Sequence, residues 1–365
     1  MSFIVPVMYD KNKAFCDQTI AMLNRFRDKI QDKIEAFCDQ QIALLKDSIV
    51  AFHDSILNPL SATKALSPSP SYDGDGLVLA PPEHWTSVAG SSKLSLVEVP
   101  RDAGVFDVLK ELLNGTGIGD GGRDQQQPGS YSSLELAAAW RVENHDLHCA
   151  YKVAQRKVLS FAAKVAVRGD TKVRIRKELY RSASKLPGDL ETGCNEVRLL
   201  HGTKPDLVWQ IVQQGMNERF AGASAGTKFG DGSYFSDDAG KIDQYVVKDE
   251  RYDAALPLHQ QLYFDSSSRH PGSVFYAFVF RVTLGHSVRY DKREGECFNA
   301  HSKRRELKNI PTTGTPYHSL VATDIYSPQF RGIPLAQQIR HRYNEYVIFH
   351  SDQTYPEYVL AYQRR

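Results

Sequence analysis

The sequence has few cysteines, no long apolar run and almost no excess of either charge. The five cysteines among 365 residues are odd in number and form no C-x-x-C pair, which argues against a zinc ribbon and a disulfide framework. No stretch reaches the ~18 apolar residues of a membrane span. The N-terminus also lacks the basic region and apolar core of a signal peptide. These absences predict a soluble, intracellular protein, cytoplasmic or nuclear, that has no membrane partner.

The composition is that of a globular protein. Hydrophobic residues make up 41% and charged residues 24% of the chain, which excludes wholesale disorder. Lys and Arg number 45 against 43 Asp and Glu, so the net charge is only +2. The whole chain therefore has no electrostatic bias toward nucleic acid. Its length favours about two domains.

Residues 1–57 form the first predicted segment, which is helical. Residues 11–57 contain no Pro or Gly, their apolar positions recur at steps of three and four, and the pentapeptide at 14–18 repeats at 36–40. The 22-residue period is two elevens, as a nearly straight helix requires, and such a helix would be roughly 70 Å long. Two interpretations stay open: self-association or a partner helix in a coiled coil, or a hairpin packed on its own protein. The Pro-, Ser- and Gly-rich residues 58–90 predict a flexible linker.

Two features farther along allow a functional and a plain structural interpretation. Residues 152–185 hold eleven Lys or Arg and two acids, but the two aromatic residues among them, Phe161 and Tyr180, do not interleave with the basic residues as a row of base-stacking platforms. A solvated helix face is therefore favoured over a nucleic-acid patch. His145, His148 and Cys149 lie close together in sequence without a second ligand cluster, so no metal site is predicted.

Residues 195–245 carry the most informative pattern. An apolar strand over 195–200 leads into His201, and a helix is predicted over 205–214 between Pro205 and Gly215. A small-residue loop over 217–226, a strand ending at 236 and a short helix over 238–247 follow. A strand-end histidine, a glycine loop and two tyrosines suggest a site for a flat ligand, because glycine admits close approach and tyrosine offers a stacking face.

Three motifs in this region, in this order, resemble the catalytic core of the poly(ADP-ribose) polymerase family. They are His201-Gly202-Thr203, Phe229-Gly230-x-Gly232-x-Tyr234-Phe235 and Lys241-x-x-Gln244-Tyr245. Residues 343–348 and 355–358 resemble the final strands of the family, most closely those of tankyrases. The resemblance extends more loosely back to about residue 90. It implies an α+β ADP-ribosyltransferase fold over 91–365, with two packed, mostly antiparallel sheets around an NAD+ cleft.

The resemblance also implies a His201, Tyr234 and Glu345 triad. His201 would hydrogen-bond the adenosine-side ribose, and Tyr234 and Tyr245 would stack on the two faces of nicotinamide. Gly202 would hold the carboxamide, and Glu345 would accept a hydrogen bond from the nicotinamide ribose. A fixed carboxylate stabilises the oxocarbenium-like centre formed when the glycosidic bond breaks.

The implied activity is NAD+-dependent transfer of ADP-ribose to protein acceptors with release of nicotinamide, and Glu345 permits extension to poly(ADP-ribose). The implied NAD+-binding set is His201, Gly202, Thr203, Asn217, Phe229, Gly230, Tyr234, Phe235, Lys241 and Tyr245.

Two residues depart from the family pattern. Ile242 stands where a serine often binds the carboxamide, and Asp231 stands where a lysine is frequent. Because of these two residues, a catalytically weak module that binds NAD+ or assembles with partners stays an alternative. The basic residues 152–185 leave ADP-ribosylation of nucleic-acid ends as another alternative. Residues 248–272 are interpreted as an inserted loop that shapes acceptor choice.

Overall fold

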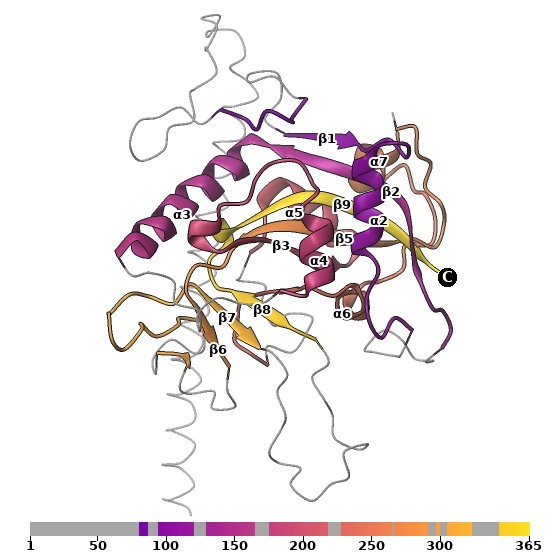
Figure 1. Ribbon diagram of the computed structural model, residues 1–365. Coiled ribbons are helices and arrows are strands. Elements are labelled where there is room, and N and C mark those ends of the chain that lie inside the picture. The colour runs from indigo at the N-terminus through magenta and orange to yellow at the C-terminus, as the bar shows by residue number, and fades with distance from the viewer. Residues whose placement is uncertain are drawn as a thin grey trace, which may run out of the picture. The chain divides into compact units, whose positions relative to one another are not determined.

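The computed structural model describes residues 80–86, 94–119, 129–164, 175–217, 228–264, 266–290, 297–299, 305–322 and 343–365 (Figure 1). The chain divides into two compact units, residues 1–69 and 70–365. All described residues belong to the second unit. The predicted N-terminal helix with its association surface and most of the predicted linker lie outside the described residues, and both stay predictions.

The described residues form a sheet covered by helices. Its strands are β1 (Leu94–Glu98), β2 (Leu134–Asn144), β3 (Glu196–Thr203), β4 (Ser233–Ser236), β5 (Phe275–Thr283), β6 (Ser287–Arg289), β7 (Ser319–Ala322), β8 (Glu345–Ile348) and β9 (Thr354–Arg364). The α-helices are α2 (Gly104–Leu112), α3 (His145–Lys164), α4 (Lys177–Ala183), α5 (Pro205–Gln214), α6 (Ala239–Ile242) and α7 (Pro257–Tyr263). Short 3-10 turns are η1 (Thr192–Cys194), η3 (Asp243–Tyr245) and η6 (Ser351–Gln353).

The strands follow the order β1-β2-β9-β5-β3-β4-β8-β7-β6 in one sheet. Every neighbouring pair is antiparallel except β6 and β7. The C-terminal strand β9 lies between β2 and β5, so the end of the chain sits inside the sheet rather than at its edge. The predicted mostly antiparallel arrangement is therefore confirmed.

The two packed sheets that the family resemblance implied take a different form. β3 joins β4 through a single residue pair, Leu200 with Ser236, whereas β3 and β5 pair along their whole length. One continuous sheet thus has two halves, β1-β2-β9-β5-β3 and β4-β8-β7-β6, which diverge at this single link (Figure 1). The expectation is corrected in this respect: the halves are hydrogen-bonded to each other at one point.

Both faces of the larger half are buried. Alternate residues of β5 and β9 contribute to two separate apolar clusters, as the two-residue period of a strand requires. One cluster includes Val208 and Val212 of α5 and Leu262 of α7, and the other includes residues of α2, α4 and α6. Central strands covered on both faces read as continuous apolar runs, which explains why β5 and β9 lack a polar face.

Local signals set several element boundaries. α5 spans Pro205–Gln214, as predicted, and ends at Gly215, whose φ of +74° suits glycine. The helix predicted over 238–247 is instead the short α6 followed by η3. The segment interpreted as an inserted loop, 248–272, contains α7, which begins at a proline.

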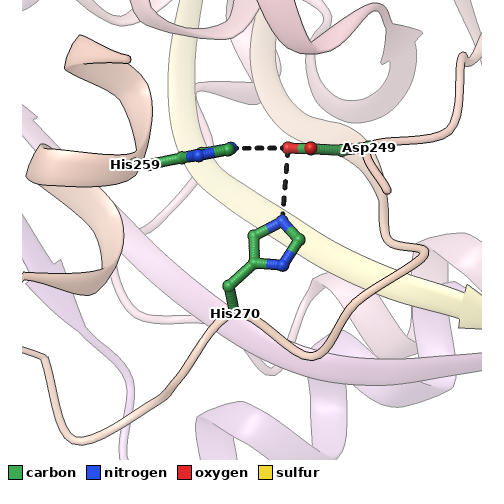
Figure 2. Close-up of side chains that lie close together, drawn as sticks. All are labelled: Asp249, His259 and His270. Atoms are coloured by element: carbon green, nitrogen blue, oxygen red, sulfur yellow. Dashed lines mark hydrogen bonds and ion pairs between the residues drawn. The ribbon is translucent and has the colours of Figure 1, made fainter. Parts of the chain in front are cut away.

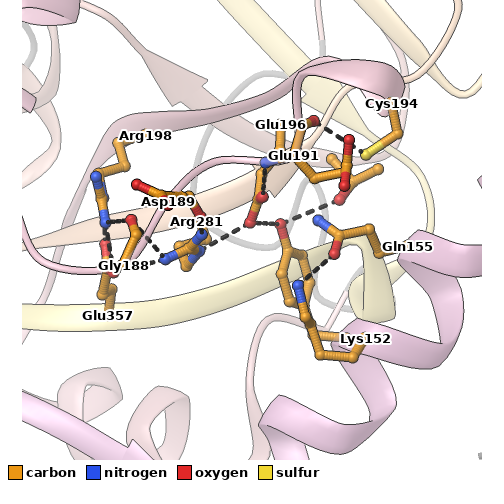
Figure 3. Close-up of polar contacts among 12 residues, drawn as sticks. Lys152, Gln155, Gly188, Asp189, Glu191, Cys194, Glu196, Arg198, Arg281 and Glu357 are labelled. Atoms are coloured by element: carbon orange, nitrogen blue, oxygen red, sulfur yellow. Dashed lines mark hydrogen bonds and ion pairs between the residues drawn. The ribbon is translucent and has the colours of Figure 1, made fainter. Parts of the chain in front are cut away.

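A buried network of charges stabilises the larger half of the sheet (Figure 3). Arg198 of β3 and Arg281 of β5 lie directly opposite each other, a placement that is unfavourable for like charges. Glu357 of β9 lies between them and accepts from Arg198 Nε at 2.6 Å and from Arg281 Nη1 at 3.2 Å. Glu196 accepts from Arg281 Nε at 2.8 Å. Burial alone would raise the pKa of Glu196, but this guanidinium outweighs burial and lowers the pKa to about 2.

The same two arginines also hold the loop before β3. Arg198 Nη1 donates to the carbonyl of Ala183 at 2.9 Å, and Arg281 Nη2 donates to the carbonyl of Asp189. The carbonyls of Pro187 and Gly188 accept from Arg198 as well. Each guanidinium thus has carboxylate and backbone partners, as a buried charge requires.

Candidate active site

Three neighbouring strands, β3, β4 and β8, bring the predicted triad together at the link between the halves of the sheet. Ser236 of β4 pairs with Leu200 on one side and with Glu345 on the other. His201 directly follows Leu200, and Tyr234 lies two positions before Ser236 on the same strand. Residues more than 140 positions apart in the chain therefore converge because of strand register.

His201 is held in one orientation. Its Nδ1 lies 2.8 Å from the main-chain carbonyl oxygen of Tyr234, so Nδ1 carries the proton and donates it. The ring packs at 5.6 Å from Phe235 and at 6.0 Å from Phe280, measured between centroids. Burial lowers the pKa of His201 below its ordinary value. The imidazole is thus neutral at pH 7, and its Nε2 is a hydrogen-bond acceptor.

Tyr234 is fixed by the glycine turn that precedes it. Its hydroxyl donates to the carbonyl of Gly230 at 2.8 Å and accepts from the amide of Phe229 at 2.9 Å. Gly230 has a φ of +106°, which favours glycine. A Cβ on Gly232 would lie 2.6 Å from the carbonyl oxygen of Ile348. The Phe-Gly-x-Gly-x-Tyr spacing is therefore a structural requirement for placing this ring.

Glu345 forms an ion pair at the start of β8. Its Oε1 lies 3.1 Å from Lys241 Nζ, and the two side chains are 9% and 13% exposed. Lys241 also donates to the hydroxyl of Tyr245 at 2.8 Å and lies 4.8 Å from the centre of that ring. Burial alone would lower the pKa of Lys241, but Glu345 and Tyr245 raise it above its ordinary value. Lys241 is therefore charged, and it links the carboxylate to the second tyrosine.

Gly202 packs against the backbone of α6. A Cβ at this position would lie 2.2 Å from the carbonyl oxygen of Ile242, so only glycine lets β3 approach α6 this closely. The side chain of Ile242 is 4% exposed and belongs to the apolar cluster that contains Leu200. Where the family often has a carboxamide-binding serine, the side chain of Ile242 therefore packs in the core.

The other predicted binding residues divide into two groups. Thr203 ends β3 and is followed by α5, and Asn217 begins the predicted donor loop, whose other residues lie outside the described part of the chain. Phe229 and Phe235 are 0% and 2% exposed within apolar clusters. These two phenylalanines are core residues next to Tyr234 and His201, and they are too buried to line an open site.

Asp231, the charge that departs from the family pattern, has a cationic neighbour. Its Oδ2 lies 3.6 Å from Arg305 Nε, and the side chains are 26% and 59% exposed. The negative charge in the glycine turn is thus partly compensated by a residue that sequence reasoning did not include. No local signal marks Arg305, because 74 positions separate the partners.

Sequence reasoning also missed a group of three titratable side chains in the segment 248–272. Asp249, His259 and His270 converge there (Figure 2), but their wide spacing in the chain matches no ligand motif. Only the fold of α7 against β5 brings them together.

A sequence model of the poly(ADP-ribose) polymerase catalytic domain matches residues 123–364. The chain belongs to this family. Catalytic domains of the poly(ADP-ribose) polymerase family are NAD+-dependent ADP-ribosyltransferases, and NAD+ is their co-substrate. The closer likeness of the last strands to tankyrases stays a prediction. Among the described residues, no helix has both the length and the apolar character needed to cross a membrane.

The residues at the sheet junction fit NAD+. A ribose hydroxyl needs an acceptor, which Nε2 of neutral His201 provides, and nicotinamide needs an aromatic face such as Tyr234. The cationic centre that forms when nicotinamide leaves needs a nearby carboxylate, and Glu345 supplies one. His201, Tyr234 and Glu345 therefore have the chemistry that the co-substrate requires.

Proposed function

We propose that this protein transfers ADP-ribose from NAD+ to protein acceptors, with His201, Tyr234 and Glu345 as its catalytic residues. The observation that carries the proposal is the placement of Glu345. Its register opposite Ser236 and its ion pair with Lys241 position a carboxylate one strand away from the rings of the site. A carboxylate placed before the reaction needs no reorganisation when positive charge develops.

In the proposed reaction, the bond between the ribose anomeric carbon and nicotinamide breaks. Nicotinamide keeps the electron pair, and an acceptor side chain forms the new bond and loses its proton. His201 accepts a hydrogen bond from the adenosine-side ribose through Nε2. Tyr234, with its hydroxyl anchored on the glycine turn, presents its ring to nicotinamide, and Tyr245 covers the other face.

Lys241 has two roles in this proposal. Before substrate binds, it balances the charge of Glu345 across 3.1 Å, which limits the cost of keeping a carboxylate largely buried. When the nicotinamide ribose binds, its hydroxyl donates to Glu345, and Lys241 keeps its second partner, the hydroxyl of Tyr245. The ammonium group thus orients the carboxylate without leaving the site.

The proposal extends to chain elongation, because Glu345 can polarise a ribose hydroxyl as well as stabilise the reacting centre. Incubation of the full chain with labelled NAD+, followed by a denaturing gel, tests both claims. We expect label on protein from the wild type and strong loss in Glu345→Gln. A high-mass smear indicates polymer, and a sharp band indicates single units.

A matched control is Glu178→Gln, because Glu178 lies on α4 with a side chain that is 74% exposed. This variant should label like the wild type. If neither wild type nor control labels any protein while both bind NAD+, the transferase proposal is wrong and a binding module is the better description. Label confined to added nucleic-acid ends would instead assign the acceptor to that class.

A further inference from the structure

Asp249, His259 and His270 form a compact cluster built by three different pieces of the chain. Asp249 lies in an isolated bridge with Val274, His259 lies on α7, and His270 lies in the loop before β5. Figure 2 shows the two imidazole rings directed at the same carboxylate. All three ligand atoms lie within 4.8 Å of one another.

The cluster is almost completely shielded from solvent. The side chains of His259, His270 and Asp249 are 0%, 1% and 10% exposed. Asp249 Oδ2 lies 2.7 Å from His259 Nε2 and 3.3 Å from His270 Nε2. The His270 contact lacks hydrogen-bond geometry, so this buried Nε2 has no hydrogen-bond partner. Because His270 Nδ1 accepts from the amide of Gly272, Nε2 carries the ring proton and faces the carboxylate. Two imidazole Nε2 atoms and one carboxylate oxygen thus converge in a buried site, and a cation that displaces the ring protons would bind all three.

The surroundings hold the carboxylate in place. The backbone of Asp249 exchanges two hydrogen bonds of 2.8 Å with Val274, and the hydroxyl of Tyr276 donates to Oδ2 at 3.1 Å. Metal-ligating side chains commonly have such outer partners, which orient them. The position of Asp249 is thus determined by β5 and not by the loop alone.

We propose that Asp249, His259 and His270 bind a divalent transition metal of the zinc class, with water completing its coordination. Two imidazole nitrogens and one carboxylate oxygen are ligands that Zn²⁺ prefers, whereas Mg²⁺ and Ca²⁺ prefer oxygen alone. A four-coordinate ion with bonds of about 2.0–2.1 Å needs ligand atoms a little over 3 Å apart. The distance of 3.3 Å between Asp249 Oδ2 and His270 Nε2 meets this requirement. The distance of 2.7 Å between Asp249 Oδ2 and His259 Nε2 must lengthen slightly.

Binding changes which ring nitrogen carries the proton. A metal on Nε2 requires the remaining ring proton of each histidine to lie on Nδ1. His259 Nδ1 accepts from the amide of Asp253 at 2.8 Å and lies 3.2 Å from the carbonyl oxygen of the same residue, so this ring gives up the first contact and donates to the second. His270 Nδ1 accepts from the amide of Gly272 at 3.1 Å without metal, so that bond is given up. Occupancy therefore reorders the loop that leads into β5.

The ion has a structural role in this proposal. It ties α7 to Asp249 and to the loop before β5, and residues of α7 line a cavity of about 610 Å³ together with Trp140 and Glu98. Tyr252 stacks on the ring of His259 at 5.5 Å and also lines that cavity. Metal binding therefore fixes the shape of the segment that the sequence assigned to acceptor choice.

Metal binding by the full chain tests the proposal without any activity measurement. The protein is stripped with a chelator, dialysed against Zn²⁺ and analysed for bound metal, and Zn²⁺ affinity is measured by calorimetry. We expect one ion per chain at this site and a thermal midpoint that rises with Zn²⁺ concentration. Asp249→Asn and His270→Asn should weaken binding by more than about 100-fold, beyond the usual effect of an outer partner.

The control is His318→Asn, which removes a histidine that is also buried and also has an unpartnered Nε2. It should keep wild-type stoichiometry. Circular dichroism establishes that each variant is folded. Folded wild type that takes up no Zn²⁺ overturns the proposal, as does undiminished binding in Asp249→Asn and His270→Asn. If those variants do not fold, the wild-type titration decides, together with the visible spectrum of the Co²⁺ form, which reports nitrogen and oxygen ligation.

Discussion

Strand β3 contributes residues to two polar sites of different design, Arg198 to one and His201 to the other. Arg198 belongs to the buried network with Glu357, Arg281 and Glu196, whose side chains are at most 9% exposed. His201 borders the candidate active site, where Lys241 balances Glu345. The network ends on backbone carbonyls and is closed to substrate, whereas the Lys241 and Glu345 pair sits where strands of the two halves meet.

This difference separates stability from chemistry. A charge in the network has partners that only compensate it, so its loss should lower the free energy of unfolding. In the proposed mechanism, a charge in the site balances a group that exchanges partners when NAD+ binds, so its loss should lower the rate of transfer. The predictions below test this separation, beginning with the largest effect.

Glu345→Gln keeps the shape of the side chain and removes its charge. We expect the rate of ADP-ribose transfer to fall on the order of 10²–10³-fold, because one preorganised electrostatic group is lost. The free energy of unfolding should change less than in the network variant described next. Initial rates and chemical denaturation measure the two quantities, and a rate within tenfold of wild type would contradict the assignment.

Glu357→Gln leaves Arg198 and Arg281 facing each other without their shared carboxylate. Removing one partner from a buried ion pair destabilises a protein by about 3–5 kcal/mol, and we expect a loss of that size in urea denaturation. Glu111→Gln is the control, because its pair with Lys185 is exposed, and it should leave the unfolding midpoint unchanged. Equal effects of the two substitutions would refute the importance of the network.

His148→Phe should flatten the pH dependence of stability. Burial, with a contribution from Lys152, lowers the pKa of His148 to about 3, and its ring packs 5.2 Å from Trp85 and 5.4 Å from Tyr355. As pH falls below 6.5, the unfolded state binds a proton that the folded state does not, so stability falls with decreasing pH. This histidine contributes about 1.4 kcal/mol per pH unit.

The informative window is pH 6.5 to 4.5. Glu196, with a pKa of about 2 when folded, adds stability that is present above its ordinary pKa of 4.5 and is lost as pH falls toward 2. Denaturation curves across pH 4.5–6.5 should therefore show a smaller slope for the phenylalanine variant. An unchanged slope would mean that His148 does not remain neutral in the folded protein.

Asp231→Asn should have the smallest effect. Its partner Arg305 is 59% exposed and 3.6 Å away, and pairs of this kind contribute at most about 1 kcal/mol. We expect little change in unfolding and a KM for NAD+ within about fivefold of wild type, the equivalent of that energy. A larger shift in KM would place Asp231 in direct contact with the co-substrate.

Local signals account for what could be predicted of the fold. α5 was predicted to the residue because a proline at its start and a glycine at its end act within one turn. The expected two sheets could not be distinguished from one, since the difference lies in the single pair Leu200 and Ser236. α7 was read as loop because a seven-residue helix leaves a short periodic pattern.

The sequence by itself determined the family and predicted the triad, because His201, Tyr234 and Glu345 lie in motifs that are continuous in the chain. Only the tertiary structure decided which groups meet: the proton position on His201, the pairing of Lys241 with Glu345, and the Asp249, His259 and His270 cluster. The physical reason is the distance along the chain over which each interaction acts. Glycine turns and helix ends are set by neighbouring residues, whereas strand register and burial depend on residues far apart in the chain.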